Sequence, residues 1–356
     1  MNKIALAALV LSTTSGCFNG CNKKKEAEAI EPAPAMPVAP ETGSAKPVAG
    51  EDVAKRFDQC WDAWNQAAWD KFKDCYTPDA TLDSPGTGEP TSKGAQAIVD
   101  GTKELKTGFP DMTGQNQLLL VHGHDLAAVT LISGTHTGPF AGVTAMNQKV
   151  GIMMGQVMTV DDQGRATAEA AYFDSGTMMA QLAPAKDHPS RPPQDKLAMP
   201  KEVVVAKDDA AEQANVTAVK SMIDAFDKHD PKAFGDTLAD DSIWSEQEEP
   251  KDWNKAETLA DREAGWKAFS DIKMVSTTMW AAGPYVVTVG TLEGTNDGPM
   301  PMLKTPTKKH ISLPYLAIQK LDGGKIKATW VFAQGLAFMQ QLGLVPAGSG
   351  AGSATK

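Results

Sequence analysis

The turn Gly134-Thr135-His136-Thr137-Gly138-Pro139 recurs 160 residues later as Gly294-Thr295-Asn296-Asp297-Gly298-Pro299. Aligning residues 110–183 with 270–343 at that spacing, without a gap, gives 14 identities in 74 positions. The identities fall on turn glycines and helix ends, where backbone geometry is most demanding. Most of the 356-residue chain therefore consists of two tandem copies of one unit, and its length suits two domains.

Each unit opens with apolar residues at the spacing of a helix face. They are Ala54, Phe57, Trp61, Trp64 and Ala68 in the first unit, and Val216, Val219, Ile223 and Phe226 in the second. A second, shorter helical segment and a turn follow, and a further helix is expected at about 93–106 and 255–268.

Alternating strands are predicted after these helices. They lie on either side of the repeated turn, at 126–132 and 149–160 in the first unit and at 286–289 and 309–320 in the second. Each unit then has a hairpin, a last strand and a short closing helix, at 177–182 and 336–342. Helices followed by a long antiparallel sheet indicate the α+β class.

Composition sets the boundaries between these units. The two domains are expected at residues 51–183 and 209–343, joined by a proline- and charge-rich linker at 184–208. Residues 344–356 have the small, apolar-poor composition of a disordered tail. Residues 1–16 have the pattern of a signal peptide, and 17–50 form a proline-rich tether.

The end of the signal peptide resembles a bacterial lipoprotein signal, because Ser15 and Gly16 precede Cys17. This resemblance implies that Cys17 is lipidated and anchors an exported protein to a membrane. Cys21 is a second candidate for lipidation, and simple secretion with Cys17 discarded is the alternative. Phe18 stands where similar lipoproteins of the inner membrane have aspartate, so we expect the outer membrane, facing the periplasm or the surface.

Charge and motifs exclude several classes of function. The formal charge of −10 argues against binding to nucleic-acid phosphates. No apolar run reaches the roughly 18 residues that span a bilayer. The chain has no glycine-rich phosphate loop, no Gly-x-Ser-x-Gly elbow and no Cys-x-x-Cys pair, which excludes nucleotide-dependent enzymes and serine hydrolases of the common type.

The end of each unit is similar to the closing strand and helix of the SnoaL-like polyketide cyclase (ester cyclase-like) family, within the nuclear transport factor two-like superfamily. The similar stretches are 172–174 with 178–182, and 330–332 with 338–343. The resemblance implies two tandem cone-shaped domains, each with N-terminal helices packed on a curved antiparallel sheet around a pocket. Because such domains commonly dimerise through the sheet, it also implies an internal pseudo-dimer or a homodimer.

The resemblance also locates the positions where cyclases of this family carry an acid/base aspartate and a histidine. They fall at Ala171 and Gln156 in the first unit, and at Val331 and Leu316 in the second. Alanine, valine and leucine cannot transfer a proton. We therefore expect a non-catalytic protein that binds a small apolar ligand or acts as a scaffold, with no cofactor.

Glu169 and Asp174 keep an alternative open, an ester cyclase or isomerase that uses an acid in the first domain. Glu169 lies two residues before Ala171, on the same strand face, although a solvent-facing glutamate is the commoner case. Asp174 is expected to cap the closing helix. His122 and His124 alternate on one strand face but have no third ligand at matching spacing, so no metal site is expected.

The pocket walls are expected to be apolar, and the second unit is interpreted as the more apolar and more structural copy. The predicted pocket residues are Trp61, Trp64, Met154, Gln156, Met158, Ala171, Phe173, Phe226, Leu316 and Val331.

Cys60 and Cys75 are predicted to form a disulfide. Export would place them in an oxidising compartment, and a hairpin of the first two helices can bring their α-carbons within bonding reach. The second unit has Met222 and Thr237 at these positions, so both cysteines are lost together. Two buried free thiols are the alternative.

Overall fold

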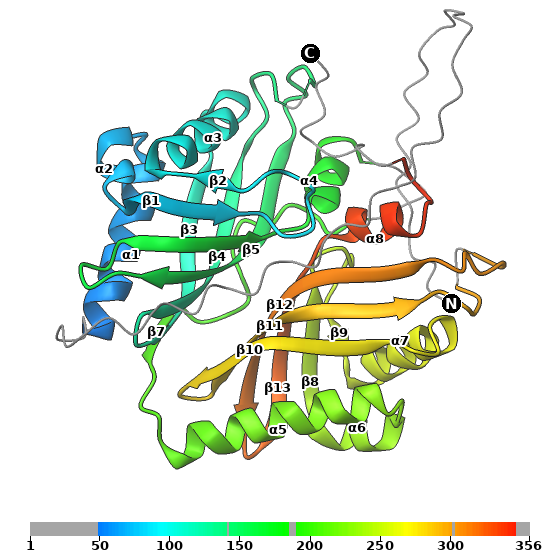
Figure 1. Cartoon of the computed structure of the whole chain (residues 1–356). Coiled ribbons are helices and arrows are strands. Elements are labelled where there is room, and N and C mark those ends of the chain that lie inside the picture. Colours follow the sequence, from blue (N-terminus) through cyan, green and yellow to red (C-terminus); the bar gives the residue numbers. More distant parts are fainter. Residues whose placement is uncertain (1–48, 141, 185–189, 301–302, 347–356) are drawn as a thin grey trace, which may run out of the picture.

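The computed structural model describes residues 49–140, 142–184, 190–300 and 303–346. Within these ranges the chain forms two α+β domains, each with helices packed on a curved sheet (Figure 1). The predicted signal peptide, Cys17 and nearly all of the tether lie outside the described residues. None of the described helices is both long and apolar enough to cross a membrane.

Domain 1 follows the predicted order of elements. They are α1 (Gly50–Asn65), α2 (Trp69–Lys73), β1 (Tyr76–Asp83), β2 (Ser92–Lys93), α3 (Ala95–Gly108), β3 (Thr113–His122), β4 (Asp125–Thr135), β5 (Lys149–Val160), β6 (Ala166–Tyr172) and α4 (Ser175–Leu182). A strand from the expected linker, β7 (Glu202–Val205), pairs in parallel with β3 and gives the sheet order β2-β1-β6-β5-β4-β3-β7.

Domain 2 repeats this order without an added edge strand. Its elements are α5 (Ala210–Asp227), α6 (Pro231–Thr237), β8 (Leu238–Glu246), β9 (Trp253–Asn254), α7 (Lys255–Ala268), β10 (Lys273–Ala282), β11 (Tyr285–Thr295), β12 (His310–Asp322), β13 (Lys325–Phe332) and α8 (Gly335–Gln341). The sheet order is β10-β11-β12-β13-β8-β9. Both sheets are mixed rather than purely antiparallel, because β1 runs parallel to β6 and β8 runs parallel to β13.

Local sequence explains where the helices begin. Asp209 accepts hydrogen bonds from the first turn of α5, and Asp230 does the same for α6, which starts with Pro231. Asn254 and Glu257 form a reciprocal capping box at α7. In domain 1, α2 has no side-chain cap.

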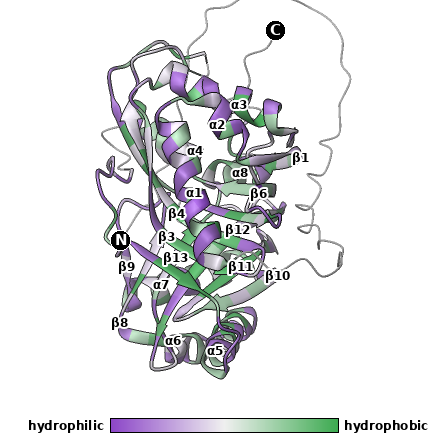
Figure 2. Ribbon diagram, turned by 90° about the vertical axis from the view of Figure 1, so that its left-hand side faces the viewer, coloured by the Kyte–Doolittle hydropathy of each residue, from purple (hydrophilic) through white to green (hydrophobic). Residues whose placement is uncertain are grey.

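A hydrophobic core lies between the two sheets. It combines side chains from β3, β4, β5 and β6 with side chains from β10, β11, β12 and β13. Figure 2 shows strongly hydrophobic stretches in the ribbon around β11 and β12. Gly155 permits this close approach, because a β-carbon there would lie 2.7 Å from the ring of Phe332 and 2.8 Å from Leu316. The tandem units therefore pair sheet to sheet within one chain, as the resemblance implied. The opposite face of each sheet packs on its own helices in a separate core.

The two closing helices cap each other across the domain boundary. Asp174 caps its own helix α4 by accepting from the Thr177 amide at 2.7 Å, which confirms the predicted cap. Its other oxygen accepts from the amide of Gly335 in α8 at 3.0 Å. Gln334, at the matching place in domain 2, accepts from the amide and hydroxyl of Ser175. Reciprocal bonds of this kind fix the relative position of α4 and α8.

The gapless alignment is wrong between the repeated turn and the hairpin. Lys149 on β5 pairs with Thr135 on β4. In domain 2 the matching Thr295 pairs with His310, so the counterpart of Lys149 is His310 and not Lys309. The loop of domain 2 is one residue longer, and its hairpin is one residue shorter. A slip of one residue moves every side chain of a strand to the other face.

Leu316 is consequently misplaced among the predicted pocket residues. It is fully buried in the core between the sheets, and Ala317 takes the place that corresponds to Gln156, paired with Val331.

We predict that Leu316→Ala lowers the free energy of unfolding by about 2–5 kcal/mol, because it leaves a cavity in the core between the sheets. Val331→Ala, on the helix-covered face and only partly buried, is the matched control and should cost less. Urea unfolding measures both. A larger loss for Val331→Ala than for Leu316→Ala would contradict this placement.

Candidate functional site

Domain 1 contains a cavity of about 920 Å³ between its sheet and its helices. This volume is in the range of pockets that hold drug-sized molecules. All of the predicted pocket residues of this domain line it: Trp61, Trp64, Met154, Gln156, Met158, Ala171 and Phe173. Ala171 and Gln156 are directly opposite each other on β6 and β5. An alanine side chain cannot transfer a proton.

Glu169 is the one deeply buried carboxylate on the wall of this cavity. It is 5% exposed, so the commoner case of a solvent-facing glutamate does not apply. The Tyr76 hydroxyl donates to Oε2 at 2.7 Å, and Gln156 Nε2 donates to Oε1 at 2.5 Å. Burial raises the pKa of Glu169 above its ordinary value, and these two hydrogen bonds oppose the shift.

The hydrogen-bond network continues from Gln156 across the sheet. The Thr130 hydroxyl lies 3.3 Å from Gln156 Oε1 and 2.8 Å from Asn116 Oδ1, to which it can donate. Asn116 in turn donates to Asp58 on α1 at 2.8 Å. These contacts link Asp58, Asn116, Thr130, Gln156 and Glu169 in one network, which keeps Glu169 and Gln156 in fixed orientations.

Asp174 lies outside the domain 1 cavity. Its carboxylate is fully used by the caps of α4 and α8, and it lies on the wall of a second cavity in domain 2. Burial raises the pKa of Asp174, while hydrogen bonds from Thr177, Gly335 and Gly176 lower it.

The second cavity measures about 1180 Å³ and lies under the helices of domain 2. Phe226 and Val331 line it as predicted, whereas Leu316 does not. The interpretation of this domain as the more apolar copy is wrong for this cavity, because Glu246, Asp261 and Arg262 line it. The loop after β8 folds into the mouth of the cavity and brings Glu248 and Glu249 to its wall.

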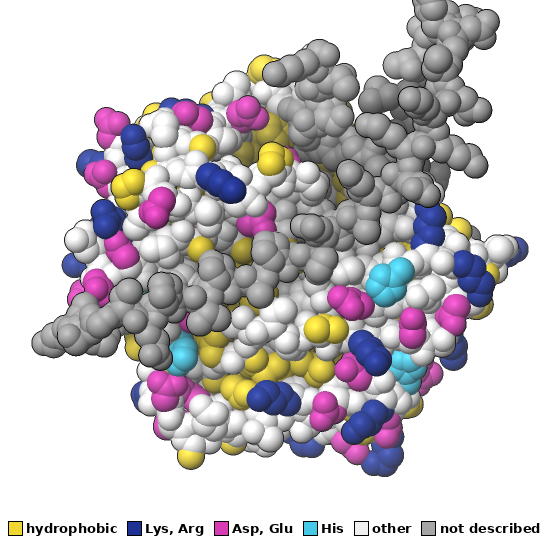
Figure 3. All heavy atoms as spheres, in the orientation of Figure 1, with side chains coloured by type: hydrophobic (Ala, Val, Ile, Leu, Met, Phe, Trp, Pro, Cys, Tyr) yellow, Lys and Arg dark blue, Asp and Glu magenta, His cyan; other side chains and the backbone are white. Residues whose placement is uncertain are grey.

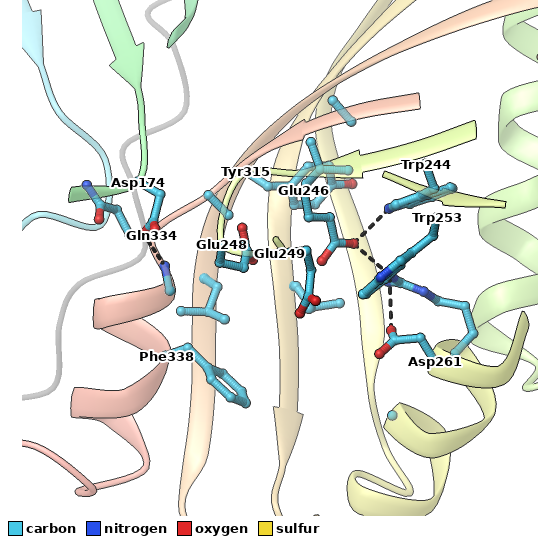
Figure 4. Close-up of a pocket in the computed structure, with 18 of the residues that line it drawn as sticks. Asp174, Trp244, Glu246, Glu248, Glu249, Trp253, Asp261, Tyr315, Gln334 and Phe338 are labelled. Atoms are coloured by element: carbon cyan, nitrogen blue, oxygen red, sulfur yellow. Dashed lines mark hydrogen bonds and ion pairs between the residues drawn. The ribbon is translucent and has the colours of Figure 1, made fainter. Parts of the chain in front are cut away.

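Arg262 occupies a box of aromatic and acidic side chains in this mouth. Its guanidinium forms ion pairs with Glu246 at 2.6 Å and Asp261 at 3.2 Å, and lies 5.0 Å from the ring centre of Trp244. Figure 4 shows the Trp244 ring nitrogen donating to the same Glu246. The positive charge of Arg262 therefore offsets part of the negative charge of Glu246 and Asp261.

Glu248 and Glu249 lie between this box and the pair formed by Asp174 and Gln334 (Figure 4). Within the described part of the chain, neither carboxylate has an ion pair or a hydrogen bond to another side chain. Enclosure by protein and the carboxylates of Glu246 and Asp174 raise the pKa of Glu248 well above its ordinary value, although solvent reaches the residue through the open cavity. Burial and the same kind of repulsion raise the pKa of Glu249 to about 7.

We predict that Glu249→Gln stabilises the protein at pH 8 and has little effect at pH 5. Because its pKa rises from 4.5 to about 7 on folding, ionised Glu249 opposes folding, and its cost appears as the pH rises through that interval. Allowing for solvent screening, the gain is about 1 kcal/mol. Unfolding at both pH values measures it, with exposed Glu263→Gln on α7 as the control. A gain equal at both pH values would contradict this assignment.

Each cavity is completed by a helix of the other domain. Residues Gln334, Leu336 and Gln340 from the α8 region line the cavity of domain 1. Gly176, Thr177 and Ala180 from α4 line the cavity of domain 2. Neither domain would have the same pocket without its partner.

Cys60 and Cys75 form the predicted disulfide, with their α-carbons 5.9 Å apart. Both residues line the domain 1 cavity, and Cys75 directly precedes Tyr76. The bond therefore ties α1 to the start of β1, at the residue that hydrogen-bonds Glu169. Strand pairing identifies the counterparts of Tyr76 and Glu169 in domain 2 as Leu238 and Thr329, so that domain lacks the polar pair as well as the bridge.

His122 and His124 have separate partners in the structure. His122 stacks on Trp280 of domain 2 and contacts Asp208, while His124 Nδ1 donates to the backbone carbonyl oxygen of Val160 at 3.0 Å. No group of three potential metal ligands occurs among the residues that the structure describes.

Comparison with known proteins places this fold in a family. The sequence model of the SnoaL-like polyketide cyclase family matches residues 51–182 and again 216–342. The chain belongs to this family, with two copies of its domain. No curated protein matches the chain significantly.

Solved structures resemble one domain of the chain at a time. A protein named as a SnoaL-like polyketide cyclase, from Jannaschia sp. CCS1, is 18% identical over 40% of this chain and 99% of its own, with a TM-score of 0.36. IdmH from Streptomyces antibioticus, named as a polyketide cyclase, is 24% identical over 36% and 97%, with a TM-score of 0.34. AclR from Streptomyces galilaeus, named as a hydroxylase, is 19% identical over 38% and 84%, with a TM-score of 0.35. At these scores the resemblances carry no argument about activity.

Proposed function

We propose that domain 1 binds a small, mostly apolar molecule without transforming it. The observation that carries this proposal is the 920 Å³ cavity, whose largely apolar wall carries the buried network of Tyr76, Glu169 and Gln156. A large apolar pocket with a few convergent polar groups is the usual form of a ligand site. Ala171 supports binding over catalysis, because it supplies no acid/base group where the family's cyclases carry one.

Domain 2 is proposed to act mainly as a scaffold. Its sheet covers the sheet of domain 1, and α8 completes the cavity of domain 1 through Gln334 and Leu336. The two domains then form an internal pseudo-dimer. Charged side chains of both signs are interspersed over the face seen in Figure 3, which offers no cationic patch there for a nucleic acid.

Glu169 favours a second candidate, an ester cyclase or isomerase that uses this residue as its acid or base. A buried carboxyl group with a raised pKa on a cavity wall has the character of a proton-transfer residue. Its carboxylate is already held by two donors, however, which suits a fixed binding group better than a group that must exchange protons with a substrate.

The test of binding is a native mass spectrum of the protein as purified from its own host. Our proposal predicts a bound small molecule that organic extraction releases unchanged. A Trp61→Ala and Trp64→Ala double variant should lose it, while Leu316→Ala, between the sheets, should retain it. An empty protein that also fails to take up any added apolar molecule would contradict binding and favour a purely structural role.

Export and anchoring at Cys17 are part of the proposed function. The Cys60–Cys75 disulfide supports export, since such bonds persist in oxidising compartments. We expect the protein to sediment with outer membranes and Cys17→Ser to release it or leave the signal uncleaved. Cys21→Ser is the matched control and should leave the protein in the membrane. Unaltered protein in the soluble fraction would contradict the anchor.

A further inference from the structure

We propose that the ligand of domain 1 is a neutral or cationic molecule whose apolar body carries a hydrogen-bond donor, such as a hydroxyl or amine, and that anions are rejected. This inference rests on the proposed binding function and specifies the chemical class of its ligand. It follows from the donors and acceptors of Tyr76, Glu169 and Gln156 that remain free toward the cavity.

The two strongest donors of the network are already committed. The only proton of the Tyr76 hydroxyl points to Glu169 Oε2, and one amide proton of Gln156 points to Oε1. A hydroxyl has two acceptor lone pairs, and a carboxylate accepts at both oxygens. The groups left for a ligand are therefore the acceptors of Tyr76 and Glu169 and the second amide proton of Gln156. Acceptors outnumber this donor, so a donor on the ligand fits the network best.

Residues on the neighbouring strands hold the side-chain amide of Gln156 in its present orientation. If the amide of Gln156 turned over, its oxygen would face the acceptor-only carboxylate of Glu169. Its present orientation places that oxygen beside the Thr130 hydroxyl instead. Asn116 and Asp58 fix Thr130 from the other side, because the Asn116 amide nitrogen is committed to Asp58 and its oxygen faces Thr130.

The charge of the cavity wall also disfavours an anionic ligand. The described residues that line the domain 1 cavity include the acids Glu89, Glu104 and Glu169, but no lysine, arginine or histidine. A buried anion needs a cation or several donors to offset its loss of hydration. Among the described residues this wall supplies no cation, and its three acids repel a carboxylate, so a fatty acid is a poor occupant despite the apolar volume.

The second domain provides an internal contrast. Leu238, Ala317 and Thr329 stand where domain 1 has Tyr76, Gln156 and Glu169. None of these three residues can reproduce the acceptor pair formed by the phenol and the carboxylate. The selectivity for donors is therefore a property of domain 1, and variants of that domain alone should abolish it.

Three fluorescent probes of one shape test the inference at neutral pH on the full mature chain. They are 1-hydroxypyrene, which has a donor, 1-methoxypyrene, which has none, and 1-pyrenecarboxylate, which is an anion. We expect 1-hydroxypyrene to bind about tenfold more tightly than 1-methoxypyrene, the scale of one hydrogen bond to a charged group, and 1-pyrenecarboxylate to bind most weakly.

Two variants separate the roles of the network. Glu169→Gln should remove the preference for 1-hydroxypyrene and improve binding of 1-pyrenecarboxylate, because an amide donates where the carboxylate accepted. Tyr76→Phe should weaken only 1-hydroxypyrene and serves if the first variant fails to fold. Glu104→Gln, exposed on the same cavity wall, is the matched control and should keep the preference.

The outcomes distinguish a failure of the binding function from an error in the ligand class. If no probe binds, the proposed binding function fails and this inference fails with it. If 1-methoxypyrene or 1-pyrenecarboxylate binds as tightly as 1-hydroxypyrene, the cavity binds apolar molecules but the assigned ligand class is wrong. Unchanged preference in both Glu169→Gln and Tyr76→Phe would also overturn the inference.

Discussion

The contact between the two sheets is the constraint on which the rest of this structure depends. A sheet with helices on one face leaves its other face apolar and in need of cover. Here each sheet covers the other, and the core between them includes Leu120, Val287, Leu316 and Phe332. Gly155 is part of that fit, since any side chain there would meet Phe332. The duplication thus solves within one chain a burial problem that a single copy would have to solve by dimerisation.

Sheet packing also places the ends of the two cones against each other. Asp174 and Gln334 each accept from the first turn of the opposite closing helix, and those helices then contribute walls to the opposite cavities. The arrangement makes the pockets dependent on the pair of domains. It also gives the domains freedom to differ in their interiors, because the shared framework holds both in shape.

Those interiors have diverged in chemistry. Domain 1 keeps an enclosed network around Glu169, while domain 2 has an open mouth where Glu248 and Glu249 remain unpaired by other described side chains. Unpaired carboxylates that repel one another reduce stability at neutral pH, as the raised pKa of Glu249 indicates. One fold thus supports two distinct environments, and only the fold is common to them.

The sequence alone determined the duplication, the α+β class, the cap at Asp174 and the disulfide, because each depends on local periodicity, turn chemistry or short separations in the chain. It also predicted the helices at about 93–106 and 255–268, which the structure has at 95–108 and 255–268. It also located six apolar residues of the domain 1 cavity, from Trp61 on α1 to Phe173 after β6. It could not determine the register of β12, since one inserted residue in the preceding loop reverses which face Leu316 occupies. Nor could it bring Tyr76 to Glu169 or fold the acids after β8 into a cavity. Those contacts join strands far apart in the chain, and only the tertiary packing of sheets and helices decides which side chains meet.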